Sequence, residues 1–87
     1  MSTFFVYILF SSKINKFYIG YSQNPEKRLE FHNSTLNKIW SKRGQPWELK
    51  TTIPFKSKTE ALKAERKIKK LKSKAIIKDI IENGWKH

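Results

Sequence analysis

The fold is decided by Thr3-Phe4-Phe5-Val6-Tyr7-Ile8-Leu9-Phe10, an unbroken run of apolar, β-branched and aromatic residues. Such a run is typical of a β-strand that is covered on both of its faces. Residues 11–15 are turn-forming, and the segment from Lys16 to Ser22 has the composition of a second strand. The two strands are therefore expected to form a β-hairpin.

Two tyrosines and a glycine lie on this hairpin. If the turn centres on Ser12-Lys13, Tyr7 lies directly opposite Tyr18 and the two rings share one face of the sheet, whereas a longer loop shifts that register. Gly20 removes a side chain from the sheet at a point where another group must approach closely. Tyrosines in core strands usually bury the ring and satisfy the hydroxyl locally, so a structural role for both is the alternative to a functional one.

A helix and a third strand are predicted to follow the hairpin. Asn24 can cap a helix that begins at Pro25 and runs to about Asn33. Residues 33–46 are mostly polar and predict a loop. Beyond the loop, alternate residues are apolar or β-branched, which predicts a strand with one buried face formed by Trp47, Leu49, Thr51, Ile53 and Phe55.

Two more helices are expected in the C-terminal half. Ser57 and Glu60 have the spacing of a capping box, which predicts the start of a long helix. Its apolar stripe consists of Ala61, Ala64, Ile68 and Leu71. A shorter helix is predicted from about Ser73 to Asn83. The element order β-β-α-β-α-α predicts an α+β fold, a small three-stranded antiparallel sheet flanked by helices, in a single domain over residues 1–87 with its core at about 3–82.

The composition narrows the possible functions. Nineteen Lys and Arg against seven Asp and Glu give the 87-residue chain a formal net charge of +12, which favours polyanionic partners such as nucleic acid. The chain has no cysteine, which excludes disulfides and thiolate metal sites. The apolar run at residues 4–10 is too short to span a bilayer. We therefore expect a cytoplasmic protein without a membrane partner.

Glu65 is an unusual residue for its position on the predicted long helix. At about 100° per residue it falls about 40° from Ala61 and about 60° from Ile68, which places it inside the apolar stripe. A partly buried carboxylate costs free energy unless a cation neutralises it. Two interpretations are open: an ion pair with Lys69 or Arg66, or a ligand of a hard metal ion whose other positions are filled by water and substrate phosphate.

Arg28 and His32 lie one helical turn apart and add a fork of hydrogen-bond donors and a titratable imidazole. With them the sequence resembles the GIY-YIG nuclease superfamily. Val6-Tyr7-Ile8 stands at the place of the first family tripeptide, Tyr18-Ile19-Gly20 matches the second, and Glu65 follows in the later helix. The chain is most similar to the short single-domain bacterial branch, related to the N-terminal nuclease domain of the excinuclease of DNA repair, which also has a segment like Gly44-Gln45-Pro46-Trp47.

This resemblance implies an endonuclease that uses Mg²⁺ or Mn²⁺ to hydrolyse DNA phosphodiester bonds in repair or recombination. Glu65 would be the sole protein ligand of the metal ion, and Tyr7 and Tyr18 would flank the attacking water. Arg28 would neutralise the phosphate, and His32 would position or deprotonate water. The sequence departs from some members of the family at Tyr21, where those members carry a lysine. The positive charge of that lysine would have to come here from Lys69 or Lys42.

The basic residues are concentrated near Glu65. Ten Lys and Arg lie between residues 56 and 78, opposed by Glu60 and Glu65 alone. This density predicts a rim of basic side chains that contacts DNA phosphates. The rim consists of two residues of the polar loop, Lys42 and Arg43, and five of the long helix, Lys63, Arg66, Lys67, Lys69 and Lys70. Trp40 can stack on an unpaired base or anchor its loop. A nucleic-acid-binding module without turnover and an RNA-binding basic protein are the alternative functions, and we expect a monomer or a weak dimer.

Overall fold

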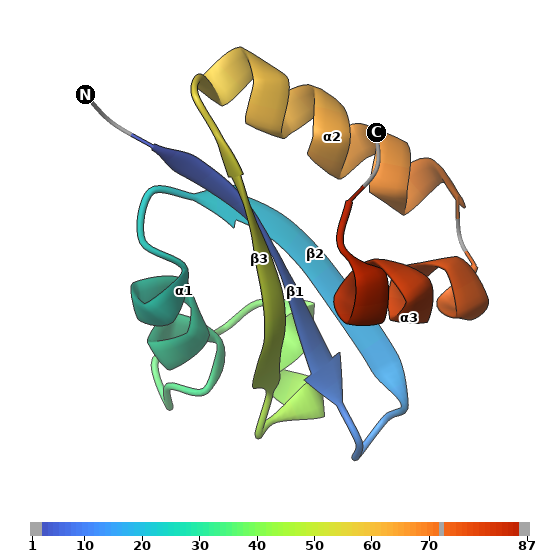
Figure 1. Ribbon diagram of the computed structural model, residues 1–87. Coiled ribbons are helices and arrows are strands. Elements are labelled where there is room, and N and C mark those ends of the chain that lie inside the picture. Colours follow the sequence, from blue (N-terminus) through green and yellow to red (C-terminus); the bar gives the residue numbers. More distant parts are fainter. Residues whose placement is uncertain (1–2, 72, 86–87) are drawn as a thin grey trace.

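Three antiparallel strands form one sheet in the order β2-β1-β3 within residues 3–71 and 73–85, the part of the chain that the computed structural model describes (Figure 1). The strands are β1 (Phe4–Ser11), β2 (Lys16–Ser22) and β3 (Glu48–Phe55). The helices are α1 (Pro25–His32), α2 (Lys58–Leu71) and α3 (Lys74–Asn83), with a short 3₁₀ helix, η1 (Trp40–Gly44), before β3. The predicted α+β fold, a three-stranded antiparallel sheet flanked by helices, is confirmed.

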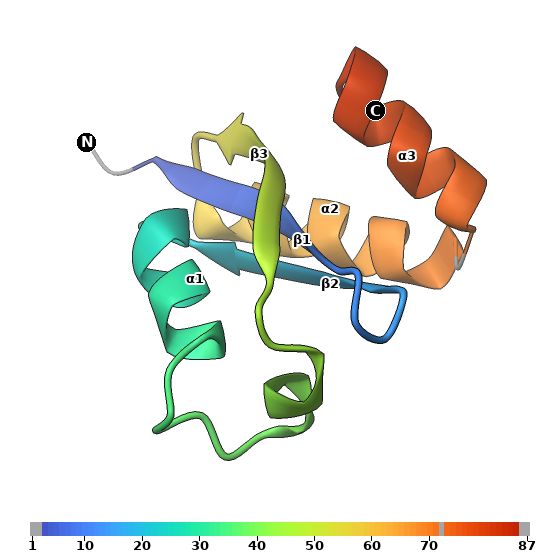
Figure 2. The same ribbon diagram turned by 90° about the horizontal axis from the view of Figure 1, so that it is seen from below.

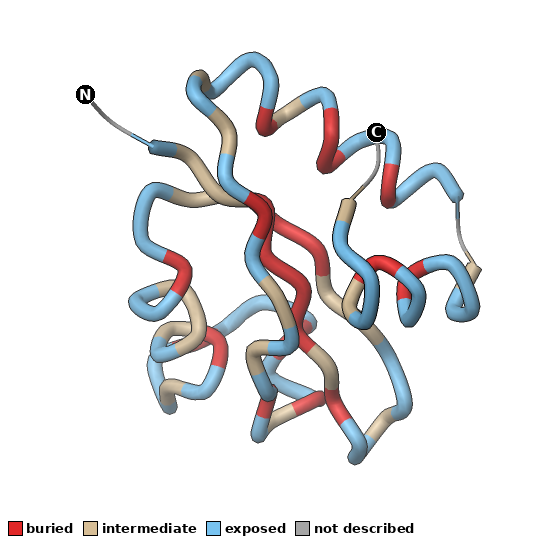
Figure 3. The backbone as a smooth tube through the Cα atoms, viewed as in Figure 1, coloured by how far each residue is buried: buried red, intermediate tan, exposed pale blue. Residues whose placement is uncertain are grey.

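The central strand β1 is covered on both faces, as its sequence predicts. Its residues Val6 to Leu9 are at most 1% exposed, and Figure 3 shows this stretch as the buried middle of the sheet. On one face, Val6 and Ile8 pack with the apolar residues of α2 and α3. On the other face, Tyr7 and Leu9 pack with Trp47 and with Leu29 of α1. Figure 2 shows α1 and the η1 segment on the opposite side of the sheet from α3.

Each of the three α-helices starts at a polar side chain that accepts a backbone N–H from the first turn, as the capping patterns predict. The acceptors are Asn24 Oδ1 for the N–H of Lys27 at 3.2 Å, Ser57 Oγ for that of Glu60 at 3.2 Å, and Ser73 Oγ for that of Ile76 at 3.3 Å. The predicted apolar stripe of α2 is correct for its first members, but Leu71 is 40% exposed because the helix ends there.

The segment between α1 and β3 folds back beneath α1. The side chain of Asn33 holds Trp47 by two hydrogen bonds, accepting from its backbone N–H at 2.6 Å and donating to its carbonyl at 3.0 Å. Gln45 Nε2 donates to the carbonyls of His32 and Ser34, both at 2.8 Å. Residues 33–46, which are predicted as a loop, therefore form a loop that contains η1. Side-chain hydrogen bonds of Asn33 and Gln45 hold this loop against the end of α1.

The prediction that β3 buries one face is wrong, because a β-bulge interrupts the strand. Ile8 pairs with Thr51, whereas its neighbour Leu9 pairs with Leu49, so Lys50 is an extra residue in β3. An extra residue reverses the faces of all residues beyond it. The two halves of the alternating pattern accordingly lie in different cores, with Ile53 and Phe55 on the α2 side and Trp47 and Leu49 on the Tyr7 side.

Candidate active site

Tyr7 and Tyr18 lie on the same face of the hairpin, but they are not directly opposite each other. The turn spans Ser12 to Asn15, longer than the two-residue turn considered for the sequence, and it pairs Tyr7 with Gly20 and Tyr18 with Leu9. Because the register shift is two residues, both rings keep their face. They stack with 6.3 Å between centroids and 16° between planes.

His32, the last residue of α1, lies between the tyrosines and the η1 segment. Its Nε2 is 3.4 Å from Tyr7 Oη, and its Nδ1 is 2.8 Å from Ser41 Oγ. Its ring centroid is 4.3 Å from that of Tyr18. The imidazole has no exposed surface. His32 therefore contacts Tyr7, Tyr18 and Ser41 and is out of reach of solvent in this structure.

The hydrogen bonds around Ser41 assign the tautomer of His32. The Oδ1 of Asn37 accepts the backbone N–H of Ile39 at 2.9 Å, which fixes the orientation of the amide. Asn37 Nδ2 then donates to Ser41 Oγ at 2.9 Å and to the His32 carbonyl at 3.0 Å. Asn37 Nδ2 is a donor, so among the hydrogen bonds of the described residues His32 Nδ1 is the only acceptor for the Ser41 hydroxyl proton. The neutral imidazole thus carries its proton on Nε2 and donates it to Tyr7 Oη.

The protonation states of the site follow from burial and from Arg28. Burial, with the nearby Arg28 charge, lowers the pKa of His32 to about 4, so the ring is neutral at pH 7. Burial raises the pKa of Tyr7, and a hydrogen bond from Arg28 opposes that rise. The pKa of Arg28 is itself raised, mainly by its hydrogen bond to Tyr7. Arg28 is therefore a fully charged, partly buried guanidinium beside the two phenols.

Glu65 is 9% exposed and lies on the inward side of α2, inside the apolar stripe as its helical position predicts. Its Oε2 is 3.6 Å from Lys69 Nζ, so the ion pair with Lys69, one of the two interpretations open for Glu65, is present. The charge of Glu65 also contributes to the raised pKa of Tyr7. The carboxylate therefore shares one electrostatic environment with Tyr7, although α2 covers the other face of the sheet.

The donor set near Glu65 suits a hard divalent cation that keeps most of its water. Within the described residues, no group of three or more His, Cys, Asp or Glu side chains could hold a metal ion. A carboxylate oxygen is the ligand that Mg²⁺ prefers, and Mg²⁺ commonly binds through one or two carboxylates together with water and substrate phosphate. Glu65 fits that pattern. When no metal ion is bound, Lys69 balances the charge of the carboxylate.

A groove of about 340 Å³ lies along the free edge of β2. Tyr18 and Trp40 line it from the side of the tyrosines and η1, and Ile68 and Lys69 line it from α2. Groups from opposite faces of the sheet therefore meet at this edge strand, where a bound molecule can reach both of them.

The basic residues predicted to contact DNA are all exposed, but they do not form one cluster. Lys69 lines the groove, and Lys42 and Arg43 follow Trp40 in η1. Lys67 Nζ instead lies 5.7 Å from the ring centroid of Trp85. Lys67 is about 160° around α2 from Glu65, so it points away from the groove. The DNA contacts themselves stay a prediction.

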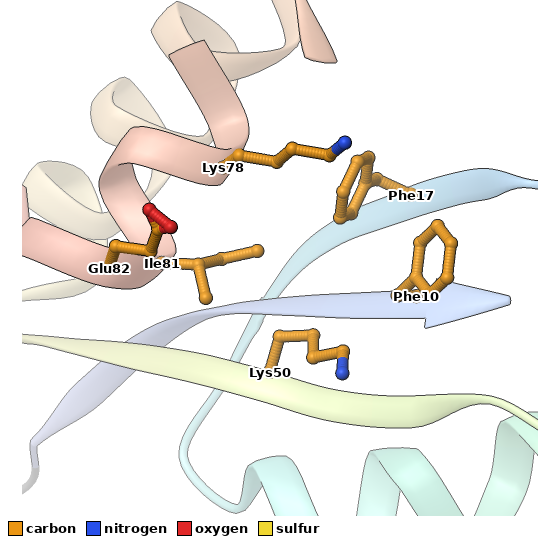
Figure 4. Close-up of a pocket in the computed structure, with 6 residues that line it drawn as sticks. All are labelled: Phe10, Phe17, Lys50, Lys78, Ile81 and Glu82. Carbon is orange, nitrogen blue, oxygen red and sulfur yellow. The ribbon is translucent and has the colours of Figure 1, made fainter. Parts of the chain in front are cut away.

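A second hollow, of about 350 Å³, lies at the far end of the hairpin against α3 (Figure 4). The rings of Phe10 and Phe17, with centroids 4.9 Å apart, form one side, and Ile81 of α3 faces them. Lys50, Lys78 and Glu82 are at its rim. This hollow holds none of the tyrosine, arginine or histidine groups of the site, and its apolar lining belongs to the packing of α3 on the sheet.

The fold and the comparisons with known proteins together define the family of this chain. The chain belongs to the GIY-YIG family, because the family model described as the GIY-YIG catalytic domain matches residues 3–78. The predicted resemblance is thus confirmed, and family membership indicates a nuclease that acts on DNA with divalent metal ions. No helix in the described part of the chain has the length and apolar character needed to cross a membrane.

The similar proteins are short bacterial chains. UPF0213 protein SH2523 of Staphylococcus haemolyticus is 34% identical over 94% of this chain and 99% of its own length. UPF0213 protein YsiG of Lactococcus lactis is 32% identical over 98% of this chain and 86% of its own, and UPF0213 protein YazA of Bacillus subtilis is 36% identical over 80% and 70%. No solved structure matches the sequence.

Sequence reasoning does not single out Ser41 and Asn37, which complete the hydrogen-bonded chain to Tyr7. Both are fully buried. The available signal was weak, since these are two uncharged polar residues in a basic, mostly polar segment, where exposure is the usual state. Only the path of the chain beneath α1 brings them to His32.

Proposed function

We propose that this protein is a cytoplasmic, Mg²⁺-dependent endonuclease that hydrolyses phosphodiester bonds in DNA during repair or recombination. One observation carries the proposal: the groove at the β2 edge is lined by Tyr18, which stacks with Tyr7, and by Lys69, which pairs with the buried carboxylate of Glu65. The guanidinium of Arg28, which is hydrogen-bonded to Tyr7, adds a positive charge. A negative ligand, a proton-accepting oxygen and a fixed cation are the three elements that phosphodiester hydrolysis requires.

Tyr7 is the proposed general base, and because its side chain is 1% exposed, the attacking water must enter between Tyr7 and Tyr18 as the substrate complex forms. The Tyr7 oxygen receives the N–H of His32 and a hydrogen bond from Arg28, and both donors stabilise a phenolate more than a phenol. In the proposed step the water oxygen attacks phosphorus, the bond from phosphorus to the leaving oxygen breaks, and the water proton passes to Tyr7. The leaving oxygen takes its proton from solvent water. Because the pKa of Tyr7 is raised in the free protein, the phenol must first give its proton to solvent water as the substrate complex forms.

The other residues bind and orient the substrate. Arg28 would donate to the phosphate oxygens on which charge develops, as a preorganised guanidinium does. Tyr18, stacked beside Tyr7, would orient the water from the other side. A divalent ion held by Glu65 would supply Lewis-acid stabilisation of that charge and a positive field that favours the phenolate. Lys69, half exposed, would move from Glu65 to a phosphate.

The alternative is a nucleic-acid-binding module with the same fold and no turnover. The ion pair between Glu65 and Lys69 favours this alternative, because a carboxylate that a lysine already balances needs no metal ion. The two functions differ in what the Glu65 carboxylate does, and a charge-neutral replacement separates them.

The test compares Glu65→Gln with the wild type on supercoiled and branched DNA, with and without Mg²⁺. We expect the wild type to nick DNA only with Mg²⁺ and Glu65→Gln to lose at least a hundredfold in rate while still binding DNA. Glu60→Gln removes the same charge from an exposed position on the same helix, so it serves as the matched control and should keep its activity.

A second control addresses the structural role of the ion pair. Lys69→Met removes the partner of Glu65 but leaves the carboxylate in place. If Glu65 only balances Lys69, both variants lose unfolding free energy, Lys69→Met more because it leaves the buried carboxylate unpaired, and neither changes a cleavage rate. Equal DNA retention by the wild type and Glu65→Gln, with no Mg²⁺-dependent cleavage by either, supports the binding module and rejects the nuclease.

A further inference from the structure

The groove on the β2 edge carries an aromatic side chain that the proposed chemistry does not use. Trp40 is 51% exposed although it is one of the largest apolar side chains of the protein. Its ring contacts Tyr18, with centroids 5.7 Å apart, and meets Trp47 edge-on at 6.1 Å. Trp47 is buried and donates its indole N–H to the Ser41 carbonyl at 2.6 Å. The inner side of Trp40 is thus held by a fixed support, while the rest of the ring is open.

The surroundings of Trp40 match a nucleotide in both shape and charge. The groove has an apolar lining from Ile68 and Ile77 and one cation, Lys69, on the α2 side. Lys42 and Arg43 follow Trp40 in η1, and both are exposed. The sequence has no Asp or Glu between residues 31 and 47, so nothing acidic in this segment repels a phosphate. A flat apolar ring with a negative charge next to it is the ligand that these groups complement.

We infer that Trp40 is a stacking site for one unpaired base of single-stranded DNA, next to the phosphate that Tyr18 and Lys69 face. In a duplex the base faces are already stacked on each other, so only an unpaired base can cover the open indole. This inference rests on the proposed function and adds its substrate class. The protein selects DNA with at least one unpaired nucleotide at the site.

Binding can be measured without cleavage in the Glu65→Gln chain. Fluorescence anisotropy gives the Kd for a labelled twelve-nucleotide thymidine oligomer and for a blunt duplex of the same length. We expect Trp40→Ala to weaken binding of the oligomer roughly tenfold, within the range for one base stacked on an aromatic ring, and to change duplex binding less than twofold. Trp40→Phe, which keeps a ring, should restore most of the affinity for the oligomer.

Leu36→Ala is the matched control, because Leu36 is 77% exposed in the same segment but has no ring. It should leave both Kd values unchanged. If Leu36→Ala and Trp40→Ala weaken binding equally, or if Trp40→Ala weakens oligomer and duplex equally, the stacking site is rejected. The stacking site is also rejected if the Glu65→Gln protein, with Trp40 unchanged, does not bind the oligomer at micromolar concentration. Tighter binding to anionic phosphatidylserine vesicles than to the oligomer rejects it as well.

A measurement without a substitution at Trp40 covers the case in which Trp40→Ala does not fold. An oligomer that contains 5-iodouracil is irradiated on the Glu65→Gln protein, and the adduct is located by mass spectrometry. An adduct on Trp40 supports the stacking site, whereas adducts found only elsewhere overturn it. Selective binding that depends on Trp40, together with a wild type that never cleaves, would reject the nuclease and keep the stacking site.

Discussion

Gly20 lies directly opposite Tyr7 across the β1–β2 ladder, and the tyrosine ring occupies the space of the missing side chain. A Cβ on Gly20 would come within 2.5 Å of Tyr7 Oη and 2.6 Å of Tyr7 Cζ. Carbon atoms do not approach so closely, so the glycine is what allows the phenol to lie flat along the sheet and reach His32. The position of the Tyr7 ring therefore depends on the absence of a side chain at Gly20.

Gly20→Ala is expected to displace the Tyr7 ring and to lower the free energy of unfolding by about 2 kcal/mol, the usual cost of overpacking a core. Urea denaturation measures this change. In a Tyr7→Leu background the ring is gone, so the added alanine should cost nothing, and the double-mutant cycle should show a coupling of similar size. Equal cost in both backgrounds would show that the Gly20 position is sensitive for a reason other than Tyr7.

Ser41→Ala is expected to change the tautomer of His32. In the wild type the Ser41 hydroxyl donates a hydrogen bond to His32 Nδ1. Because Nδ1 is the acceptor, the proton of the neutral imidazole is on Nε2. Nitrogen-15 NMR at pH 7 in a His87→Asn background, which leaves one histidine, should show the Nε2–H form. Ser41→Ala should give a mixture of tautomers, and Ser41→Thr should restore the single form. A wild-type spectrum of the Nδ1–H form contradicts the assignment.

The stability of the protein is expected to fall in mild acid because of His32. The folded pKa is lowered to about 4, from an ordinary value of 6.5. Between these values the unfolded state binds more protons than the folded one, so stability is complete above pH 6.5 and is lost as the pH falls toward 4. The loss is roughly 3 kcal/mol. Urea denaturation of the wild type minus that of His32→Gln isolates this part from the carboxylates, and a difference independent of pH between 7.5 and 4 would contradict it.

The salt dependence of DNA binding is expected to separate the basic residues by position. Lys69→Ala, and Lys42→Ala with Arg43→Ala, should each reduce the slope of log Kd against log salt by about 0.9 per lost duplex phosphate contact. Lys67→Ala should change it less, because the Lys67 ammonium lies over the Trp85 ring on another side of α2. Equal slopes for the Lys67 and Lys69 variants would indicate that the whole exposed surface of α2 binds DNA.

The hairpin and β3 show where the sequence did not suffice. Alternation identified β3 as a strand, but the pattern is equally regular with or without a bulge, and only pairing with β1 reveals Lys50 as the extra residue. The same holds for Tyr7 and Tyr18. Their shared face follows from the period of two, whereas their offset depends on the conformation of the turn from Ser12 to Asn15.

What the sequence determined by itself is the order of the strands and α-helices, the start of each α-helix at a capping residue, and the inward position of Glu65 on α2. These properties depend on the backbone geometry of a single helix or strand, whose period is fixed. Tertiary structure alone decided that His32 donates to Tyr7, that Ser41 and Asn37 support it, and that Trp40 opens on the groove. Those contacts join residues far apart in the chain, and they form because the segment beneath α1 is held by the side-chain hydrogen bonds of Asn33 and Gln45.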